Sequence, residues 1–96
     1  MLVLVCYDIG DVAGDGSVRL RRVAEACLNH GTRVQFSVFE CRLSEALWIG
    51  LRARLLSVFD GSKDSLRFYF LCETDERKVE KHGRTSGIDP TGPLIV

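Results

Sequence analysis

The chain begins with an unbroken apolar run that ends on a carboxylate. Residues 1–7 are all hydrophobic, and Asp8, Ile9 and Gly10 follow directly. A continuous aliphatic run of this length, closed by Gly and Asp, predicts a strand buried on both faces in the middle of a sheet. Asp8 would then lie at the end of a central strand, where folds with helices packed on a sheet place functional side chains. A turn-forming role is the alternative, because Asp often begins a turn.

Hydrophobic residues then recur at helical spacing in two stretches. The Gly- and Asp-rich residues 10–16 are expected to form a loop. A first helix is expected to be capped by Ser17 and to close at Asn29-His30-Gly31, and a second to begin at Ser44, as its cap, and to end at Asp60-Gly61. The residues expected on the two apolar faces are Leu20, Val23, Ala24, Cys27 and Leu28, and then Leu47, Trp48, Leu51, Leu55 and Val58.

Alternating hydrophobic and polar residues predict β structure over residues 32–43. This run is long for one strand, so it is either a single strand or two short strands with a break near residues 35–37. Strict alternation places Arg33, Gln35, Ser37 and Phe39 on one side and Val34, Phe36 and Val38 on the other. Residues 65–72 predict a further strand, and Leu94-Ile95-Val96 a short tail strand that pairs with a sheet edge.

The order of these elements defines the fold class. With two strands in the middle segment, the order is β-α-β-β-α-β, an α+β, ferredoxin-like arrangement with both helices on one face of the sheet. The 96 residues make a single domain, residues 1–96, with a modest core, so burial against a partner is expected. This topology hosts many functions and selects none of them.

Charge and cysteine usage exclude several classes of protein. Thirteen basic and thirteen acidic residues cancel, so net charge favours no partner, although ten of the basic residues are Arg, which suits bidentate contact with phosphates. The four cysteines show no C-x-x-C spacing and are expected to be core residues in a reducing cytoplasm. The N-terminal apolar run has no flanking basic region or cleavage site and is too short to span a membrane.

Three arginines lie at the start of the first expected helix. Arg19, Arg21 and Arg22 fall within its first turn and a half, where the helix dipole is positive and favours anions. Something negative should therefore offset them. The candidates are the loop acids Asp11 and Asp15, or a bound phosphate, which helix N-termini also attract.

Five segments together resemble a known family over essentially the whole chain. They are Tyr7-Asp8-Ile9, Arg22-Val23-Ala24, the G-T-R-V-Q-F-S-V-F-E run of residues 31–40, the D-S-L-R-F-Y-F-L run of residues 64–71, and Gly92-Pro-Leu-Ile. They are similar to the CRISPR-associated protein two family, the small nuclease-like partner of the CRISPR integrase.

The resemblance implies an architecture and two activities. It implies a ferredoxin-like homodimer in which the first strands approach across a two-fold axis, with residues 83–96 as a C-terminal tail that pairs with the partner subunit. It also implies a metal-dependent endonuclease for RNA or DNA, and a scaffold for the integrase that supports DNA during spacer acquisition. The glycine-rich residues 10–16 are longer than the short polar loop common in the family.

The resemblance also implies site residues. Asp8 matches the metal-binding, catalytic carboxylate and Tyr7 its neighbour, while Arg33, Phe39 and the helix residue Arg22 match substrate-binding positions. One Asp per chain is too few for Mg²⁺, but a two-fold axis brings a second copy, and Mg²⁺ accepts one or two carboxylates plus waters and phosphate oxygens. The ion would activate a water, with Arg22 or Arg33 stabilising the transition state.

Alternatives to this chemistry stay open. Two facing Asp8 carboxylates could simply share a proton, with no catalysis. The chain would then be an adaptor that holds duplex DNA by arginine contacts to phosphates, with binding that weakens as salt rises. A toxin-type ribonuclease of the same fold is a third hypothesis. The resemblance favours a CRISPR adaptation protein with metal-dependent nuclease activity, expected to act on duplex DNA or single-stranded RNA in the cytoplasm.

Overall fold

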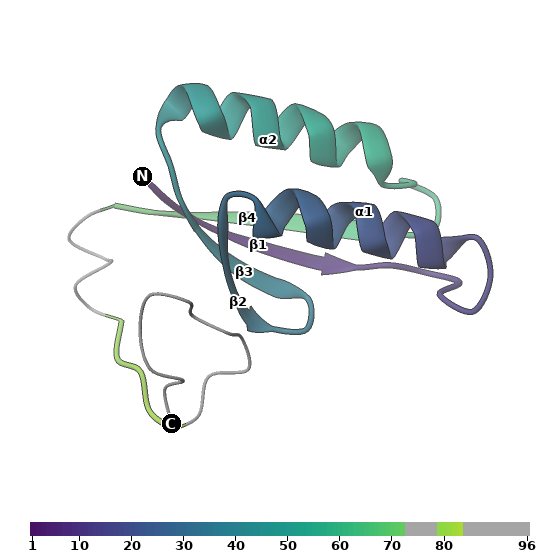
Figure 1. Cartoon of the computed structure of the whole chain (residues 1–96), viewed down its shortest axis with the longest axis horizontal. Coiled ribbons are helices and arrows are strands. Elements are labelled where there is room, and N and C mark those ends of the chain that lie inside the picture. The colour runs from purple at the N-terminus through teal and green to yellow at the C-terminus, as the bar shows by residue number, and fades with distance from the viewer. Residues whose placement is uncertain (73–78, 84–96) are drawn as a thin grey trace.

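A four-stranded antiparallel sheet is covered on one face by two helices in this computed structural model, which describes residues 1–72 and 79–83 (Figure 1). The strands lie in the order β2-β3-β1-β4. In chain order the elements are β1 (Leu2–Asp8), α1 (Gly16–Leu28), β2 (Gly31–Gln35), β3 (Val38–Arg42), α2 (Glu45–Val58) and β4 (Ser65–Leu71). The predicted ferredoxin-like β-α-β-β-α-β order is confirmed. The expected tail strand 94–96 lies outside the described residues.

Strand β1 occupies the interior of the sheet, as its apolar run predicts. It pairs antiparallel with β3 on one side and with β4 on the other. Val3, Val5 and Tyr7 alternate along it, and all three are buried in the core that the helices cover. The intervening residues face the helix-free side, where Leu4 and Cys6 are partly buried and Asp8 is exposed.

The core between the sheet and the helices is smaller than helical spacing predicts. Trp48 packs edge-on against Phe68, with ring centroids 4.8 Å apart. Leu28 and Leu47, both expected on apolar faces, are each 53% exposed. Leu28 is the last residue of α1, and Leu47 flanks the narrow stripe of α2 that meets the sheet. The buried helix residues besides Gly16 are Val23, Ala26 and Cys27 in α1 and Trp48, Leu51 and Leu55 in α2.

The middle segment is a hairpin, which confirms two strands with a break near residues 35–37. The predicted faces are only partly correct, because a register shift between Arg33 and Gln35 moves Gln35 to the other face. Arg33 pairs with Phe39 and shares its face, whereas Gln35 pairs with Val38 on the other face. Phe36 lies in the turn and is 87% exposed.

The helix ends are partly as predicted. α1 begins at Gly16 with Asp15 at the cap position, so the expectation that Ser17 caps it is wrong. Gly31 begins β2 and does not close the helix; a Cβ there would overlap the Glu40 carbonyl oxygen. Ser44 caps α2 as predicted, since its Oγ accepts a hydrogen bond from the Leu47 amide at 3.2 Å. Within the described ranges, no helix is both long and apolar enough to cross a membrane.

We expect Ser44→Ala to lower the free energy of unfolding by about 1 kcal/mol, because the Leu47 amide loses its capping acceptor. Denaturant unfolding followed by circular dichroism measures this loss. The matched control is Ser57→Ala near the other end of α2, where the hydroxyl only donates back to the Arg54 carbonyl at 2.7 Å. Equal losses in the two variants would contradict a capping role for Ser44.

Candidate functional site

Asp8 lies at the end of the central strand, where the sequence places it. It is the last residue of β1, it is exposed, and it stands opposite Ser65 in β4. Its neighbours Tyr7 and Ile9 are only 5% and 7% exposed. The carboxylate therefore reaches solvent from a backbone that is anchored on both sides.

Three of the residues predicted to bind substrate form one cluster on the helix-covered face. The Tyr7 hydroxyl donates to the Phe36 carbonyl oxygen at 3.1 Å, and its ring stacks on Phe39 with centroids 6.1 Å apart. The Arg33 guanidinium carbon lies 5.1 Å from the centroid of the Phe39 ring, a cation–π contact. Burial raises the pKa of the Tyr7 phenol, and the nearby Arg33 cation opposes that rise.

Phe39 and Tyr7 belong to the core of the protein. Phe39 is fully buried and Tyr7 nearly so. As placed, Phe39 offers no surface for a substrate, so its predicted role as a direct contact is replaced by support for Arg33. Phe39 shares the face of Arg33, as alternation predicts, but this is the face that the helices cover and not an open polar face.

Arg33 is the member of this cluster that can reach a ligand. It is partly buried, and its Nε is buried without a hydrogen-bond partner among the described residues. A buried donor left without an acceptor is costly, but Nε is itself shielded from a ligand, so a phosphate oxygen would have to bind the exposed part of the Arg33 side chain. Arg22, the fourth predicted residue, is exposed on α1 and forms no ion pair within the described part of the chain.

The predicted site residues are divided between the two faces of the sheet. Tyr7, Arg33 and Phe39 lie on the helix-covered face, and Asp8 lies on the helix-free face because side chains alternate along β1. These residues were grouped because they match segments of one family, and such a match carries no information about the face of the sheet on which a side chain lies. Asp8 and Arg33 are therefore two separate features of the molecule.

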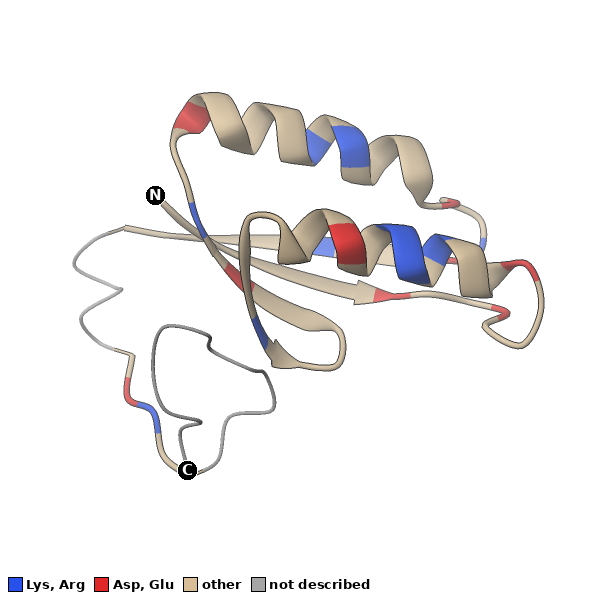
Figure 2. Ribbon diagram, viewed as in Figure 1, with Lys and Arg blue, Asp and Glu red and all other residues tan. Residues whose placement is uncertain are grey.

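The helix-free face carries both charges and uncovered apolar groups. Leu4 and Cys6 of β1 stand opposite Tyr69 and Arg67 of β4. Tyr69 is 47% exposed, and its hydroxyl oxygen lies 3.4 Å from Nη1 of Arg67. On β3, Glu40 pairs with the exposed Lys81 at 3.7 Å. Figure 2 shows acidic and basic residues interspersed over the fold.

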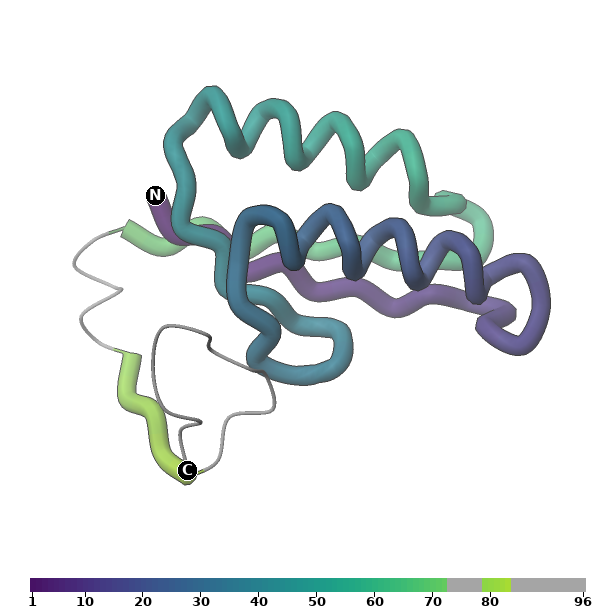
Figure 3. Tube along the Cα trace, viewed as in Figure 1, coloured from purple at the N-terminus to yellow at the C-terminus, as the bar shows by residue number. Residues whose placement is uncertain are grey.

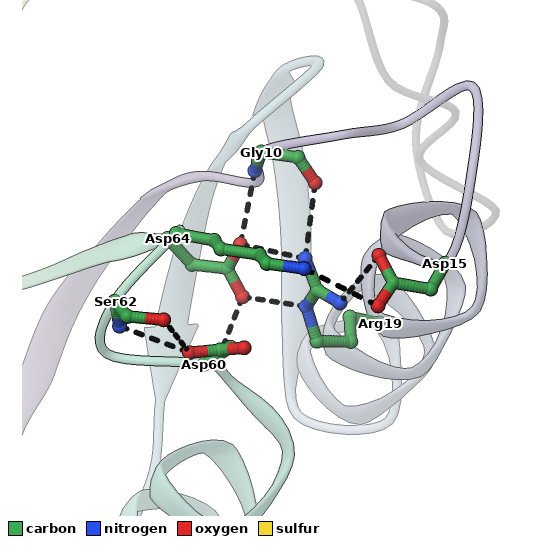
Figure 4. Close-up of polar contacts among 7 residues, drawn as sticks. Gly10, Asp15, Arg19, Asp60, Ser62 and Asp64 are labelled. Carbon is green, nitrogen blue, oxygen red and sulfur yellow. Dashed lines mark hydrogen bonds and ion pairs between the residues drawn. The ribbon is translucent and has the colours of Figure 1, made fainter.

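A buried ion pair beside Asp8 is the feature that sequence reasoning missed (Figure 4). The Asp64 side chain is fully buried and accepts hydrogen bonds from the Gly10 amide at 2.9 Å and the Asp60 amide at 2.8 Å. Arg19 Nε donates to Asp64 at 2.8 Å, and its Nη1 pairs with Asp15 at 3.2 Å. The positive charge of Arg19 is thus offset by the loop residue Asp15, which was one of the predicted partners. Its main partner is Asp64, which was not predicted. The available signal was an Asp directly before a strand.

Metal binding is limited by the number of ligands in one chain. Among the residues that the structure describes, no three His, Cys, Asp or Glu side chains are grouped to hold an ion. An exposed Asp8 carboxylate nevertheless suits Mg²⁺, which takes one or two protein carboxylates and keeps several waters. The donor set fits the ion when two copies of the chain contribute to one site.

We expect acid to weaken the wild-type protein more steeply than the Asp64→Asn variant. The hydrogen bond from Arg19 lowers the pKa of Asp64 to about 2, from its usual 3.8. A depressed folded-state pKa means that this carboxylate stabilises the fold above about pH 4, and that the stabilisation disappears as the pH falls to about 2. The extra loss in wild type should be about 2 kcal/mol in denaturant unfolding across this range. Parallel pH curves for the two proteins would contradict it.

Comparison with known proteins gives consistent matches. Residues 1–79 match the family model described as CRISPR associated protein Cas2. The chain is 50% identical over 96 residues to the CRISPR-associated endoribonuclease Cas2 of Nitratidesulfovibrio vulgaris, covering 100% of this chain and 94% of that protein. It is 49% identical to the protein of the same name from Chlorobaculum tepidum, covering 100% of both. The crystal structure of Streptococcus pyogenes Cas2 matches with a TM-score of 0.75 and 43% identity, over 86% of this chain and 100% of that one.

Proposed function

The chain belongs to the CRISPR-associated protein Cas2 family, and from this membership we propose that it is an endonuclease of CRISPR adaptation that hydrolyses phosphodiester bonds through Asp8. The observation that carries the proposal is the Asp8 carboxylate, exposed at the end of the central strand on the helix-free face. Relatives are named both endoribonucleases and endonucleases, so the substrate class is RNA or DNA. Membership of this family favours CRISPR adaptation over a toxin-type ribonuclease.

A second copy of the chain completes the proposed site. The helix-free face leaves Leu4 and Cys6 only partly buried and Tyr69 half exposed, so it has apolar area to bury against a partner. A two-fold axis across this face brings equivalent residues together, including both Asp8 carboxylates. The proposed dimer therefore supplies the second ligand that a single chain lacks.

The two Asp8 carboxylates would hold a divalent cation such as Mg²⁺. When bound, such an ion acidifies a coordinated water and neutralises charge on a phosphate oxygen. Rigid attachment of Asp8 to β1 fixes where the phosphodiester must lie. A histidine base near Asp8 is not evident in the described residues: His30 follows the far end of α1, about 20 Å from its start, and His82 pairs with Glu80 at 3.1 Å.

A separate nucleic-acid-binding role is favoured by the position of Arg33. Its unpartnered Nε lies on the opposite face of the sheet from Asp8, with its guanidinium held over Phe39. Together with the exposed Arg22, it offers contacts to a phosphate backbone that do not depend on catalysis. We propose that these arginines hold duplex DNA while the chain serves as a scaffold for the CRISPR integrase in spacer acquisition.

We expect Asp8→Asn to reduce cleavage of labelled single-stranded RNA and duplex DNA by about 100-fold or more, because the carboxylate ligand is lost. Wild-type cleavage should require Mg²⁺ and stop with chelator. The matched control is Asp11→Asn, which removes the same charge from the neighbouring loop; Asn tolerates the φ of 53° at this position. The control should cleave like wild type. Full activity in Asp8→Asn would refute catalysis through Asp8.

We expect Arg33→Ala to weaken binding of duplex DNA and to reduce the slope of log affinity against log salt by about 1, since one phosphate contact is removed. Fluorescence anisotropy at several salt concentrations measures both quantities. Arg52→Ala, which removes an exposed arginine from α2, is the control and should leave the slope unchanged. An unchanged slope in Arg33→Ala would exclude a phosphate contact at this residue.

A further inference from the structure

The peptide that follows Asp8 is held by the buried ion pair of Arg19 and Asp64 (Figure 4). We infer that Arg19 and Asp64 are positioning residues, which fix the Asp8 carboxylate through Gly10 and so set the affinity of the site for a divalent cation. This inference rests on the proposed function, because it assumes that Asp8 is a cation ligand.

Gly10 is the residue through which the ion pair of Arg19 and Asp64 binds the segment that follows β1. Its amide donates to Asp64 Oδ1 at 2.9 Å, and its carbonyl oxygen accepts from Arg19 Nη2 at 3.0 Å. Both polar groups of the Gly10 backbone are therefore occupied by the two members of one ion pair. Ile9, between Gly10 and Asp8, is buried, so this short segment has little freedom to rotate.

The surrounding backbone packs closely around Gly10. A Cβ on Gly10 would lie 2.5 Å from the Lys63 carbonyl oxygen, and a Cβ on Gly16 would overlap the Gly10 carbonyl oxygen. Gly10 is thus enclosed between the turn before β4 and the start of α1. Figure 3 shows these segments, far apart in sequence, meeting at one end of the fold.

Asp8 is linked to residues 64–65 by two routes, one through the sheet and one through Gly10. Asp8 stands opposite Ser65 in the β1–β4 ladder, and Ser65 directly follows Asp64. Asp64 in turn binds Gly10, two residues beyond Asp8. Asp8 is therefore restrained by the ladder on one side and by the Gly10 amide on the other, and the same segment, residues 64–65, supplies both restraints.

The ion pair itself is firmly fixed. Asp64 Oδ2 also accepts from the Asp60 amide at 2.8 Å, and Arg19 is only 13% exposed and pairs with Asp15 as well. These contacts tie Arg19 to the loop before α1 and Asp64 to the turn before β4. Ligand residues must be held within about 0.5 Å to bind a metal well. Loss of a partner bonded directly to the ligand typically costs 10- to 100-fold in affinity, so support that acts through the Gly10 backbone is expected to lie at the lower end of that range.

The test compares Asp64→Asn with Asp60→Asn, its matched control. Asp60 lies in the same turn, but its carboxylate contacts Ser62, and the contact of Asp60 with Asp64 comes from its backbone amide, which the control keeps. Mn²⁺ affinity is measured by calorimetry, and amide hydrogen exchange is measured at Ile9 and Gly10. Cleavage is followed across a Mg²⁺ titration.

We expect Asp64→Asn to bind Mn²⁺ about tenfold more weakly, to need more Mg²⁺ for half-maximal cleavage and to recover near-wild-type cleavage at saturating Mg²⁺. Exchange should accelerate at Ile9 and Gly10 but not in β3, and Asp60→Asn should behave like wild type. If Asp64→Asn does not fold, Arg19→Lys provides the same test, because lysine keeps the charge but lacks the planar fork with which Arg19 bonds Asp64 and Gly10 at once.

The test distinguishes failure of the proposed function at Asp8 from failure of the positioning role of Arg19 and Asp64. Wild-type protein that binds no Mn²⁺ and cleaves nothing would overturn the proposed function at Asp8. Wild-type protein that binds Mn²⁺ and cleaves, with unchanged Mn²⁺ affinity in Asp64→Asn or Arg19→Lys, would overturn the positioning role alone. A merely structural role would lower the melting temperature without shifting the Mg²⁺ requirement.

Discussion

The rest of the structure depends on the burial of β1 between β3 and β4. β1 is hydrogen-bonded to a strand on each side, so it has no free edge. Its residues Val3, Val5 and Tyr7 form the apolar surface of the sheet against which α1 and α2 pack. Because side chains alternate along the strand, burying these three residues obliges Asp8 to face the other way, into solvent. The exposure of the candidate catalytic carboxylate thus follows from hydrophobic packing on the opposite face.

Much of the fold could be predicted from local pattern. The apolar run of β1 identified a central strand, and Ser44 identified the start of α2, because both signals depend on residues adjacent in sequence. The position of Asp8 followed directly from the end of that run. The face of Gln35 could not be derived in this way, since the register shift after Arg33 places it on the face of Val38 and not on that of Arg33 and Phe39.

The buried ion pair of Arg19 and Asp64 could not be predicted from local sequence pattern either, but for a different reason. Arg19 and Asp64 are 45 residues apart, and although each occupies a notable position, at a helix start and directly before a strand, no local pattern pairs one with the other. What selects them is tertiary: the turn before β4 meets the start of α1 only when the sheet has formed. A carboxylate shielded from water is then favourable only because several donors converge on it.

The enclosure of Gly10 also bears on how the loop between β1 and α1 can vary. Gly10 and Gly16 are fixed points that fit closely against each other, whereas residues 11–15 between them are exposed. A change in loop length can be absorbed in this exposed segment without moving either fixed point. Insertions and deletions among homologous chains should therefore accumulate at residues 12–14, between the Asp11 carbonyl that binds Gly16 and the Asp15 carboxylate that pairs with Arg19, and this segment is the natural place to graft a peptide epitope or attach a fluorophore.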